Sequence, residues 1–323
     1  MADEEQLYYV TPTVRSGPMS RVSGCEVYLK LENLQAPASF KIRGVSNLCK
    51  KAVRGRNCQH LVCASGGNAG MAAAYAGMKL KTPATIVLPE STSAQVAENL
   101  RQLGAEVLVH GKVFDHANKF AMELAAKPGA EYIHPFDHPD IWEGHESLIV
   151  EAAAQMPVKP DVVLTSVGGG GLLIGIVQGM WKVGWKDVPI IAMETDGANC
   201  FNAAIKAGEL VTLPDITSVA KCLGSLTVSS RAFELHQKKE HNIQSVVIED
   251  KEAVSACLRF ADDHRMLVEP ACGAALAAVY SNIIPALQQE GRLGKVETAL
   301  AVVCGGGSVS LDMLQAWKKQ FDL

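Results

Sequence analysis

The 323-residue sequence lacks the features that mark secreted, membrane-spanning or nucleic-acid-binding proteins. Its 30 basic and 34 acidic residues are scattered and give a net charge of −4, so no basic face for nucleic acid or anionic lipid is expected. No apolar run reaches membrane-spanning length without charges or glycine-rich turns. The first residues are acidic and polar, unlike a secretory or mitochondrial presequence. We therefore expect a cytoplasmic protein that binds neither nucleic acid nor membrane.

Patterned cysteines and metal ligands are also missing. Cysteine occurs nine times, an odd number, and no Cys-x-x-Cys pair is present. Most of these cysteines lie in apolar runs, where a small buried thiol is the usual interpretation, and reduced thiols agree with a cytoplasmic location. His145 and Glu146 begin a zincin-like motif, but Ile149 stands where the second histidine belongs. Structural disulfides and a zinc site are therefore not expected.

Hydrophobic residues, by contrast, make up 48% of the chain, which is enough for a substantial core. Apolar strands alternate with helical stretches, a pattern typical of parallel sheets joined by right-handed crossovers. We predict an α/β fold with two parallel-sheet domains, a small one at residues 35–140 and a large one made of residues 1–34 and 141–323. Residues 269–287 are predicted to form one buried helix of small residues, whereas the segment before residue 24 has little periodicity.

Lys41 is predicted to lie where an extended segment gives way to a helix, with Ser39 as the N-cap. The positive end of the helix dipole disfavours an ammonium in the first turn and lowers the pKa of the amine. A neutral amine is what a Schiff-base lysine requires. The alternative is a solvated surface lysine, which is the commoner case for an isolated residue.

A run of four glycines follows an apolar strand and precedes a helix, at Gly168, Gly169, Gly170 and Gly171. Ligands of open parallel sheets bind at the carboxyl ends of strands, where such a turn points its N–H groups outward. With no side chains in the way, the turn predicts a phosphate site. It has neither a Walker lysine nor the G-x-G-x-x-G pattern, so a small phosphate ester is expected. The alternative is a tight packing turn.

Two further turns follow apolar strands. The turn made of Ser65, Gly66, Gly67, Asn68 and Ala69 offers a hydroxyl, an amide side chain and backbone N–H groups, which suit a carboxylate. An N-capped helix start is the alternative. Cys304 ends the third strand and could face a ring nitrogen, the alternative being a buried small residue.

A reactive lysine, a phosphate turn, a carboxylate turn and a thiol together suggest pyridoxal phosphate and an amino acid. The sequences around Lys41, Ser65 and Gly168 resemble those of the fold-type II pyridoxal-phosphate enzymes, whose fold is tryptophan synthase β-like. The details, which include Pro135-Phe136-Asp137, are similar to the animal L-serine dehydratase and serine dehydratase-like group, over essentially the whole chain. The resemblance implies a homodimeric L-serine ammonia-lyase that also acts on L-threonine, giving pyruvate or 2-oxobutanoate and ammonia by β-elimination.

The resemblance also implies a role for each site residue. Lys41 would hold the cofactor as a Schiff base and remove the substrate's Cα proton. Phe40 would stack on the pyridine ring, Asn68 would bond its 3′-oxygen, and Cys304 would meet its nitrogen as a neutral partner. The four glycines would bind the phosphate, and the substrate carboxylate would be bound by Ser65, Gly66, Gly67, Asn68 and Ala69.

A monovalent cation such as K⁺ is the last feature that the resemblance implies. It would lie near Glu194, a buried and paired glutamate being the alternative for that residue. The remaining oxygen ligands would be the carbonyls of Gly168, Ala198, Leu223 and Ser225.

The sequence departs from these relatives at two places. Pro37 and Ala38 stand where relatives have serine and glycine, and Gly307 and Ser308 where they have serine and asparagine. Serine racemase is an alternative function, but relatives with that activity carry a serine at the position of Gly66, which has no proton to give. A weakly active pyridoxal-phosphate-binding protein that acts through partners is another alternative. A Rossmann oxidoreductase is disfavoured because its fingerprint is missing.

Overall fold

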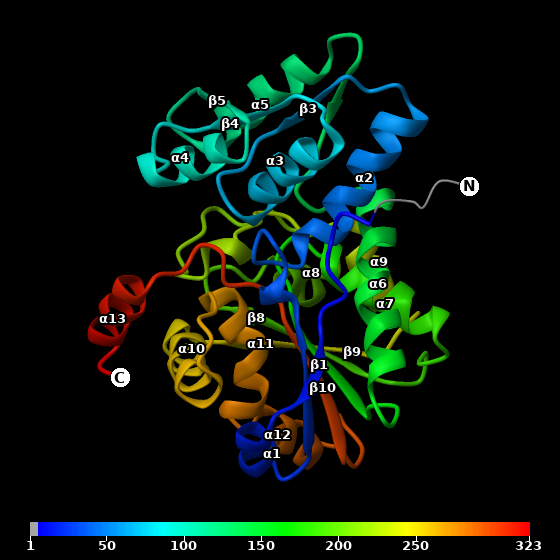
Figure 1. The fold of residues 1–323 in the computed structure, drawn as a ribbon. Helices are drawn as coiled ribbons and strands as arrows, with labels where there is room; N and C mark the ends of the chain where they lie inside the picture. The colour runs from blue at the N-terminus through cyan, green and yellow to red at the C-terminus, as the bar shows by residue number, and fades with distance from the viewer. Residues whose placement is uncertain (1–5) are drawn as a thin grey trace. The chain divides into compact units, whose positions relative to one another are not determined.

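The computed structural model describes residues 6–323, which fall into two compact units (Figure 1). The small unit comprises the described residues up to Tyr9 and Gln35–His145, and the large unit comprises Val10–Leu34 and Glu146–Leu323. Each unit contains its own sheet, flanked by helices, and parallel pairing dominates both sheets. The predicted α/β class is confirmed.

The limits of these units differ from the predicted domain limits at the N-terminus. Residues 6–9 were expected in the large domain but belong to the small unit. Tyr9 N donates to Gln35 Oε1 at 2.8 Å, and Gln35 Nε2 donates to Tyr9 O at 2.9 Å. The Arg43 guanidinium also lies 4.7 Å from the centre of the Tyr8 ring. These long-range contacts, which a local pattern does not reveal, hold the segment.

The boundary at the C-terminal end of the small unit falls inside helix α6 (Pro139–Gln155), after His145, whereas the large domain was predicted to resume at residue 141. The first turns of α6 pack closely on helix α2 (Lys41–Gly55). A Cβ built at Gly44 would lie only 2.6 Å from the Ile141 carbonyl oxygen and 2.6 Å from His145 Cε1. Asn47 Nδ2 also donates to the Asp140 carbonyl at 2.7 Å. That each unit folds by itself as a domain remains a prediction.

The large unit contains a six-stranded sheet in the order β1-β2-β10-β7-β8-β9. All neighbouring strands are parallel except β1, which runs antiparallel to β2. Strands β7, β8 and β10 are buried at every position, as parallel strands covered on both faces are. The strand bounds are β1 (Thr13–Arg15), β2 (Glu26–Leu31), β7 (Val162–Ser166), β8 (Ile190–Thr195), β9 (Ile243–Ile248) and β10 (Thr298–Val303).

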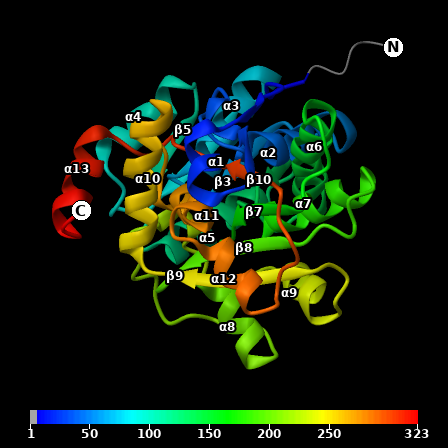
Figure 2. The ribbon, with the colours of Figure 1, turned by 90° about the horizontal axis from the view of Figure 1, so that it is seen from below.

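Helices lie on both sides of this sheet, with α10 and α11 on one side and α7 on the other (Figure 2). The helix bounds are α1 (Gly17–Ser23), α7 (Gly171–Lys182), α8 (Cys200–Ala207), α9 (Ser230–Gln237), α10 (Asp250–His264), α11 (Pro270–Tyr280), α12 (Ile283–Gln289) and α13 (Leu311–Gln320). Two short 3₁₀ turns, η1 (Glu32–Leu34) and η2 (Lys221–Leu223), complete the unit.

The single helix predicted over residues 269–287 is wrong, because the chain forms α11 and α12 with a bend of 52° between them. Asn282, between the two helices, has a φ of 57°, a left-handed conformation that a continuous right-handed helix does not contain. Helix α11 is buried along its whole length, as expected. Within residues 6–323, no single helix is long and apolar enough to cross a membrane, although this bent pair together meets the length and composition criteria.

The small unit contains a four-stranded parallel sheet in the order β5-β4-β3-β6. Alternate residues of β3 enter different cores, because successive side chains of a strand point to opposite faces. Leu61 and Cys63 pack with α2 and α3, whereas Val62 and Ala64 pack with α5. The remaining bounds are β3 (His60–Cys63), α3 (Asn68–Leu80), β4 (Ala84–Leu88), α4 (Ala94–Gln102), β5 (Glu106–Val109), α5 (Phe114–Ala125) and β6 (Ala130–Tyr132).

Candidate active site

Lys41 is the first residue of α2, as predicted, but Ser39 does not cap the helix. The N-cap is Phe40, which already has helical dihedral angles and makes no side-chain cap bond. Ser39 therefore lies one residue too early to reach the free N–H groups of α2. Its hydroxyl is buried and has no hydrogen-bond partner among the described residues. Because buried polar groups are almost always paired, this hydroxyl beside Lys41 is a candidate ligand contact.

The Lys41 amine lies against a loop of the small unit. Nζ donates a hydrogen bond to the Pro135 carbonyl oxygen at 2.6 Å. It also lies 5.2 Å from the centre of the Phe40 ring, whose other neighbour is the His145 ring at 4.9 Å. The sequence alone did not indicate the role of this carbonyl, because no residue type encodes a backbone acceptor.

The turn from Ser65 to Ala69 joins β3 to α3. Ser65 Oγ accepts a hydrogen bond from Gly67 N at 3.2 Å, which leaves the hydroxyl hydrogen available to donate as predicted. Gly67 is the N-cap of α3, and Asn68 and Ala69 are its first residues. A Cβ at Gly70 would lie 1.8 Å from the Ser65 carbonyl oxygen, so only glycine permits this turn. N–H groups at the start of a 13-residue helix suit an anion.

The four glycines lie between β7 and α7. Gly170 is the N-cap of α7 and has a φ of 93°, which favours glycine. A Cβ at Gly170 would lie 2.6 Å from Ala232 Cβ, and one at Gly168 would lie 3.0 Å from Leu223 Cα. The Gly169 carbonyl accepts from Ser229 N at 2.9 Å, which holds the turn. The packing therefore demands glycine at positions 168 and 170, and the turn presents main chain alone at the start of a 12-residue helix.

Cys304 directly follows β10, and its side chain is buried. Its Sγ lies 3.6 Å from Ser166 Oγ and also hydrogen-bonds the Cys272 side chain. The bond with Cys272, followed by burial, raises the pKa of the Cys304 thiol well above its ordinary value. Cys304 is therefore a neutral thiol at physiological pH.

Glu194, near the end of β8, is buried and caps α8. Its Oε1 accepts from Phe201 N at 2.9 Å and its Oε2 from Asn202 N at 2.8 Å. Burial raises the pKa of the Glu194 carboxyl to about 8, although these two N–H donors act in the opposite direction. A buried and paired glutamate, the alternative considered above, describes this geometry.

Part of the expected cation cage is assembled in the large unit. Gly168 and Leu223 lie in contact, because a Cβ at Gly168 would be 3.0 Å from the Leu223 carbonyl oxygen. The Gly168 carbonyl also accepts from Cys200 Sγ at 3.4 Å. Within the described part of the chain, no cluster of three or more His, Cys, Asp or Glu could hold a metal. A cation here would therefore rely on carbonyl oxygens, and it remains a prediction.

The family model described as "Pyridoxal-phosphate dependent enzyme" matches residues 4–305. This chain belongs to that family. The pyridoxal-phosphate enzyme is 56% identical over 318 residues to a human protein named "Serine dehydratase-like", covering 98% of this chain and 96% of that protein. It is 54% identical over 325 residues to the mouse "L-serine dehydratase/L-threonine deaminase", covering 100% and 98%.

A solved structure of a fungal L-serine ammonia-lyase from Rhizomucor miehei superposes on this pyridoxal-phosphate enzyme with a TM-score of 0.90. The two chains are 33% identical, and the match covers 98% of this chain and 100% of the fungal one. The fold-type II resemblance inferred from the motifs is thus confirmed, and pyridoxal phosphate is the cofactor of the family.

The residues present fit this cofactor. The Lys41 amine suits the cofactor's aldehyde, and the glycine turn at the N-terminus of α7 suits its phosphate. The neutral Cys304 thiol suits an unprotonated ring nitrogen. The Cβ contacts at Gly168 and Gly170 show that this turn is built for exposed main chain. The buried Ser39 hydroxyl supplies a further polar group beside the amine. The role of each residue remains a proposal.

Two histidines have environments that the sequence interpretation missed. His134 is half-buried, and its Nδ1 accepts two backbone hydrogen bonds, from Phe136 N and Asp137 N. His145 is fully buried, and neither ring nitrogen has a partner among the described residues. Burial, helped by Lys41 and Arg43, lowers the pKa of His145 well below its usual value. Helical spacing could have indicated that His145 is buried, because it follows buried Ile141 by four residues and so lies on the same face of α6.

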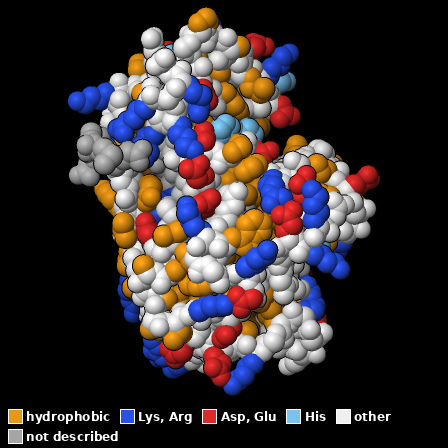
Figure 3. Space-filling model, turned by 90° about the vertical axis from the view of Figure 1, so that its right-hand side faces the viewer, with side chains coloured by type: hydrophobic (Ala, Val, Ile, Leu, Met, Phe, Trp, Pro, Cys, Tyr) orange, Lys and Arg blue, Asp and Glu red, His pale blue; other side chains and the backbone are white. Residues whose placement is uncertain are grey.

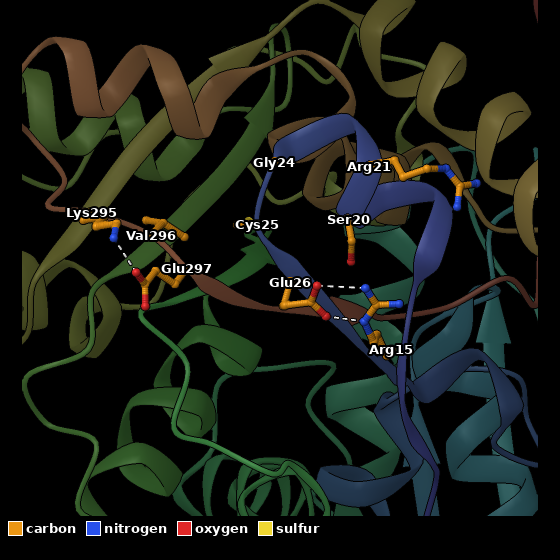
Figure 4. A pocket seen from close by; sticks show the side chains of 9 residues that line it. All are labelled: Arg15, Ser20, Arg21, Gly24, Cys25, Glu26, Lys295, Val296 and Glu297. Atoms are coloured by element: carbon orange, nitrogen blue, oxygen red, sulfur yellow. Dashed lines mark hydrogen bonds and ion pairs between the residues drawn. The ribbon is translucent and has the colours of Figure 1, made fainter.

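The surface of the large unit also has a polar hollow of about 510 Å³, which contains none of the predicted site residues (Figure 4). Four of its charged side chains pair with one another, Arg15 with Glu26 and Lys295 with Glu297, and Arg21 also lines it. Acidic and basic side chains are likewise interspersed on the face drawn in Figure 3. The predicted chemistry therefore lies elsewhere.

Proposed function

We propose that this enzyme is an L-serine ammonia-lyase that also accepts L-threonine and releases pyruvate or 2-oxobutanoate with ammonia by β-elimination. Relatives named for this activity are similar over the full length of the chain. The structural observation that carries the proposal is buried Cys304 directly after β10, with its Sγ 3.6 Å from Ser166 Oγ and its thiol neutral. A neutral partner leaves the ring nitrogen unprotonated and the cofactor a weaker electron sink. Elimination tolerates this, because the β-hydroxyl leaves promptly.

The chain's own residues supply binding and proton transfer. When bound, pyridoxal phosphate supplies withdrawal of electrons from the substrate's Cα. We assign the covalent attachment and removal of the Cα proton to the Lys41 amine, with Phe40 packed on the cofactor ring and Asn68 bonded to the ring oxygen. The phosphate is assigned to Gly168, Gly169, Gly170 and Gly171, and the substrate carboxylate to Ser65, Gly66, Gly67, Asn68 and Ala69.

The first test is turnover of L-serine and L-threonine by the purified holoenzyme, measured as pyruvate and 2-oxobutanoate. Borohydride is expected to fix the cofactor on Lys41, located by mass spectrometry. Lys41→Ala should lose the covalent adduct and at least about 10³-fold in kcat, because attachment and proton transfer depend on the same amine. Pyruvate formation at the wild-type rate by this variant would refute the assignment. An adduct on Lys41 without pyruvate would favour the weakly active binding protein.

Racemisation is the second candidate, and Gly66 argues against it. A racemase needs a proton donor on the face opposite Lys41, and position 66 offers none. A Cβ there would lie 3.1 Å from Thr92 Cγ2 and 3.3 Å from Leu88 Cδ2, so the site is also narrow. Chiral analysis of serine during turnover should find little D-serine. D-serine accumulating as fast as pyruvate would establish racemase activity instead.

We further infer a homodimer in the cytoplasm that K⁺ activates. The free thiols of all nine cysteines support a reducing compartment. Contact between Gly168 and Leu223, whose carbonyl groups would be ligands, supports an oxygen site for a monovalent cation. Light scattering measures the oligomeric state, and turnover with K⁺ against tetramethylammonium measures the cation effect. Equal rates in the two salts would remove the cation from the proposal.

A further inference from the structure

The loop that follows β6 is held in place from several sides within the small unit. Ile133 N donates to Val62 O at 2.7 Å, which anchors the start of the loop to β3. Trp142 Nε1 donates to Phe136 O at 3.0 Å, which anchors its middle to α6. At its end, His138 Nδ1 accepts from Asp140 N at 3.1 Å. The loop therefore presents its carbonyl groups in defined directions.

His134 makes the tightest contacts inside this loop. Its Nδ1 accepts from Asp137 N at 2.7 Å and from Phe136 N at 3.2 Å, so the ring closes a turn around Pro135. The ring also packs edge-on against Phe136, with centroids 4.7 Å apart at 82°, and against Tyr132 at 6.0 Å. Both bonds need an unprotonated Nδ1, since a protonated imidazole is donor-only.

This arrangement fixes the position of the Pro135 carbonyl oxygen. That oxygen lies 2.6 Å from Lys41 Nζ. The ring, the turn and the carbonyl belong to consecutive residues, so a change at His134 Nδ1 moves the acceptor of the lysine hydrogen directly.

We propose that His134 is a positioning residue for Lys41, which it serves by holding the Pro135 carbonyl as the resting acceptor of one amine hydrogen. This rests on the proposed role of Lys41 in catalysis. With one hydrogen held, the lone pair of the neutral amine is confined to the two remaining tetrahedral directions, which orients it both for attack on the cofactor's aldehyde and for removal of the Cα proton. Misplacing a reacting group by about 1 Å can cost about 100-fold in rate.

Burial of the His134 ring keeps this acceptor available. Burial lowers the pKa of His134 to about 4, with Lys41 and His138 acting in the same direction and Asp137 against them. Nδ1 thus remains an acceptor throughout the pH range in which the amine can be neutral.

The test compares the wild type with His134→Leu, which removes the acceptor, and His134→Asn, whose Oδ1 can accept from the N–H groups two and three residues later. His138→Leu is the matched control, since it removes a similar loop bond that does not shape the Pro135 turn. Two rates are measured: kcat for L-serine, and the rate at which apo protein gains the yellow absorbance of the lysine-bound cofactor.

For His134→Leu we expect both rates to fall by about 10- to 100-fold with KM within about threefold. His134→Asn should recover both to within about threefold, and His138→Leu should leave both unchanged. Unaltered rates in His134→Leu, or no recovery in His134→Asn, would overturn the proposal. If the wild type forms no pyruvate, the proposed function fails, whereas the attachment rate still tests the role of His134.

A measurement on the wild type guards against variants that do not fold. The Asp137 amide, bonded at 2.7 Å, should exchange its hydrogen at least about 10-fold more slowly than an unstructured amide. Exchange at the unstructured rate would show that His134 does not hold the turn, and the proposal would be abandoned.

Discussion

Ala38 lies three residues before Lys41 and has a φ of 55°, in the left-handed region. The resemblance to fold-type II enzymes implies glycine at this position, and glycine adopts such a conformation without strain. The conformation closes a turn in which Ala38 N donates to Gln35 O at 2.7 Å. The chain therefore carries local strain in the segment that leads to its proposed reactive lysine, and Ala38→Gly should relieve it.

The expected increase in the free energy of unfolding of Ala38→Gly follows from two opposing terms. A left-handed conformation costs an L-residue about 1–2 kcal/mol. Glycine returns about 0.5–1 kcal/mol of this through the greater entropy of its unfolded chain. The net stabilisation is therefore about 0–1.5 kcal/mol, which corresponds to a rise in Tm of up to about 3 °C for a protein of this size.

Thermal unfolding of the apo and cofactor-loaded protein measures this gain. Ala36→Gly is the matched control, because Ala36 is an exposed alanine of the same loop outside the left-handed region. There only the entropy term acts, so Tm should fall by about 1–2 °C. The two alanine-to-glycine changes should thus have opposite signs. If Ala38→Gly lowers Tm as Ala36→Gly does, the strain argument is refuted.

Three other predictions concern buried polar groups and the phosphate turn. His145→Leu should reduce the loss of stability on acidification. Because the pKa of His145 is lowered in the folded state, the unfolded chain takes up a proton below about pH 6.5 that the folded protein does not, and the folded state loses stability as the pH falls further. The drop in Tm between pH 7.5 and pH 5 should therefore be smaller in the variant, and an identical drop would contradict this. Glu194→Gln leaves one N–H of α8 without its acceptor and should cost about 1–3 kcal/mol in urea unfolding, whereas exposed Glu209→Gln should cost almost nothing. Gly170→Ala should destabilise the protein by about 1–3 kcal/mol more than Gly184→Ala and should weaken cofactor binding. Both glycines have a positive φ, but only Gly170 has neighbours that a Cβ would meet. Equal losses of stability in the two variants would count against the packing argument.

The positions of the candidate site residues relative to strands and helices were largely predictable, because these patterns are local. A strand followed by glycines and a helix can be recognised from the sequence. This pattern predicted Ser65, Gly168 and Cys304 at strand ends, where the structure has them. Lys41 was likewise expected at the start of a helix, and it is there. The capping of that helix was not predicted correctly, because Phe40 adopts helical dihedral angles and moves the N-cap past Ser39.

Some elements escaped the sequence interpretation because their signals are weak. Helix α9 has only eight residues, and it is held through buried Ala232, Phe233 and Leu235. Strand β1 has three residues and depends on antiparallel pairing with β2. A single residue, Asn282, divides what reads as one apolar helix into α11 and α12.

The sequence by itself determined the α/β class and the glycine turns and predicts Lys41 as the reactive amine, since each depends on residue type and near-neighbour spacing. Only the tertiary structure decided that the Pro135 carbonyl faces the amine, that His134 closes the turn behind it, and that the ring nitrogens of buried His145 have no hydrogen-bond partner within residues 6–323. Hydrogen-bond partners and burial depend on residues distant in the chain. Backbone acceptors, moreover, leave no mark in the sequence, because every residue has one.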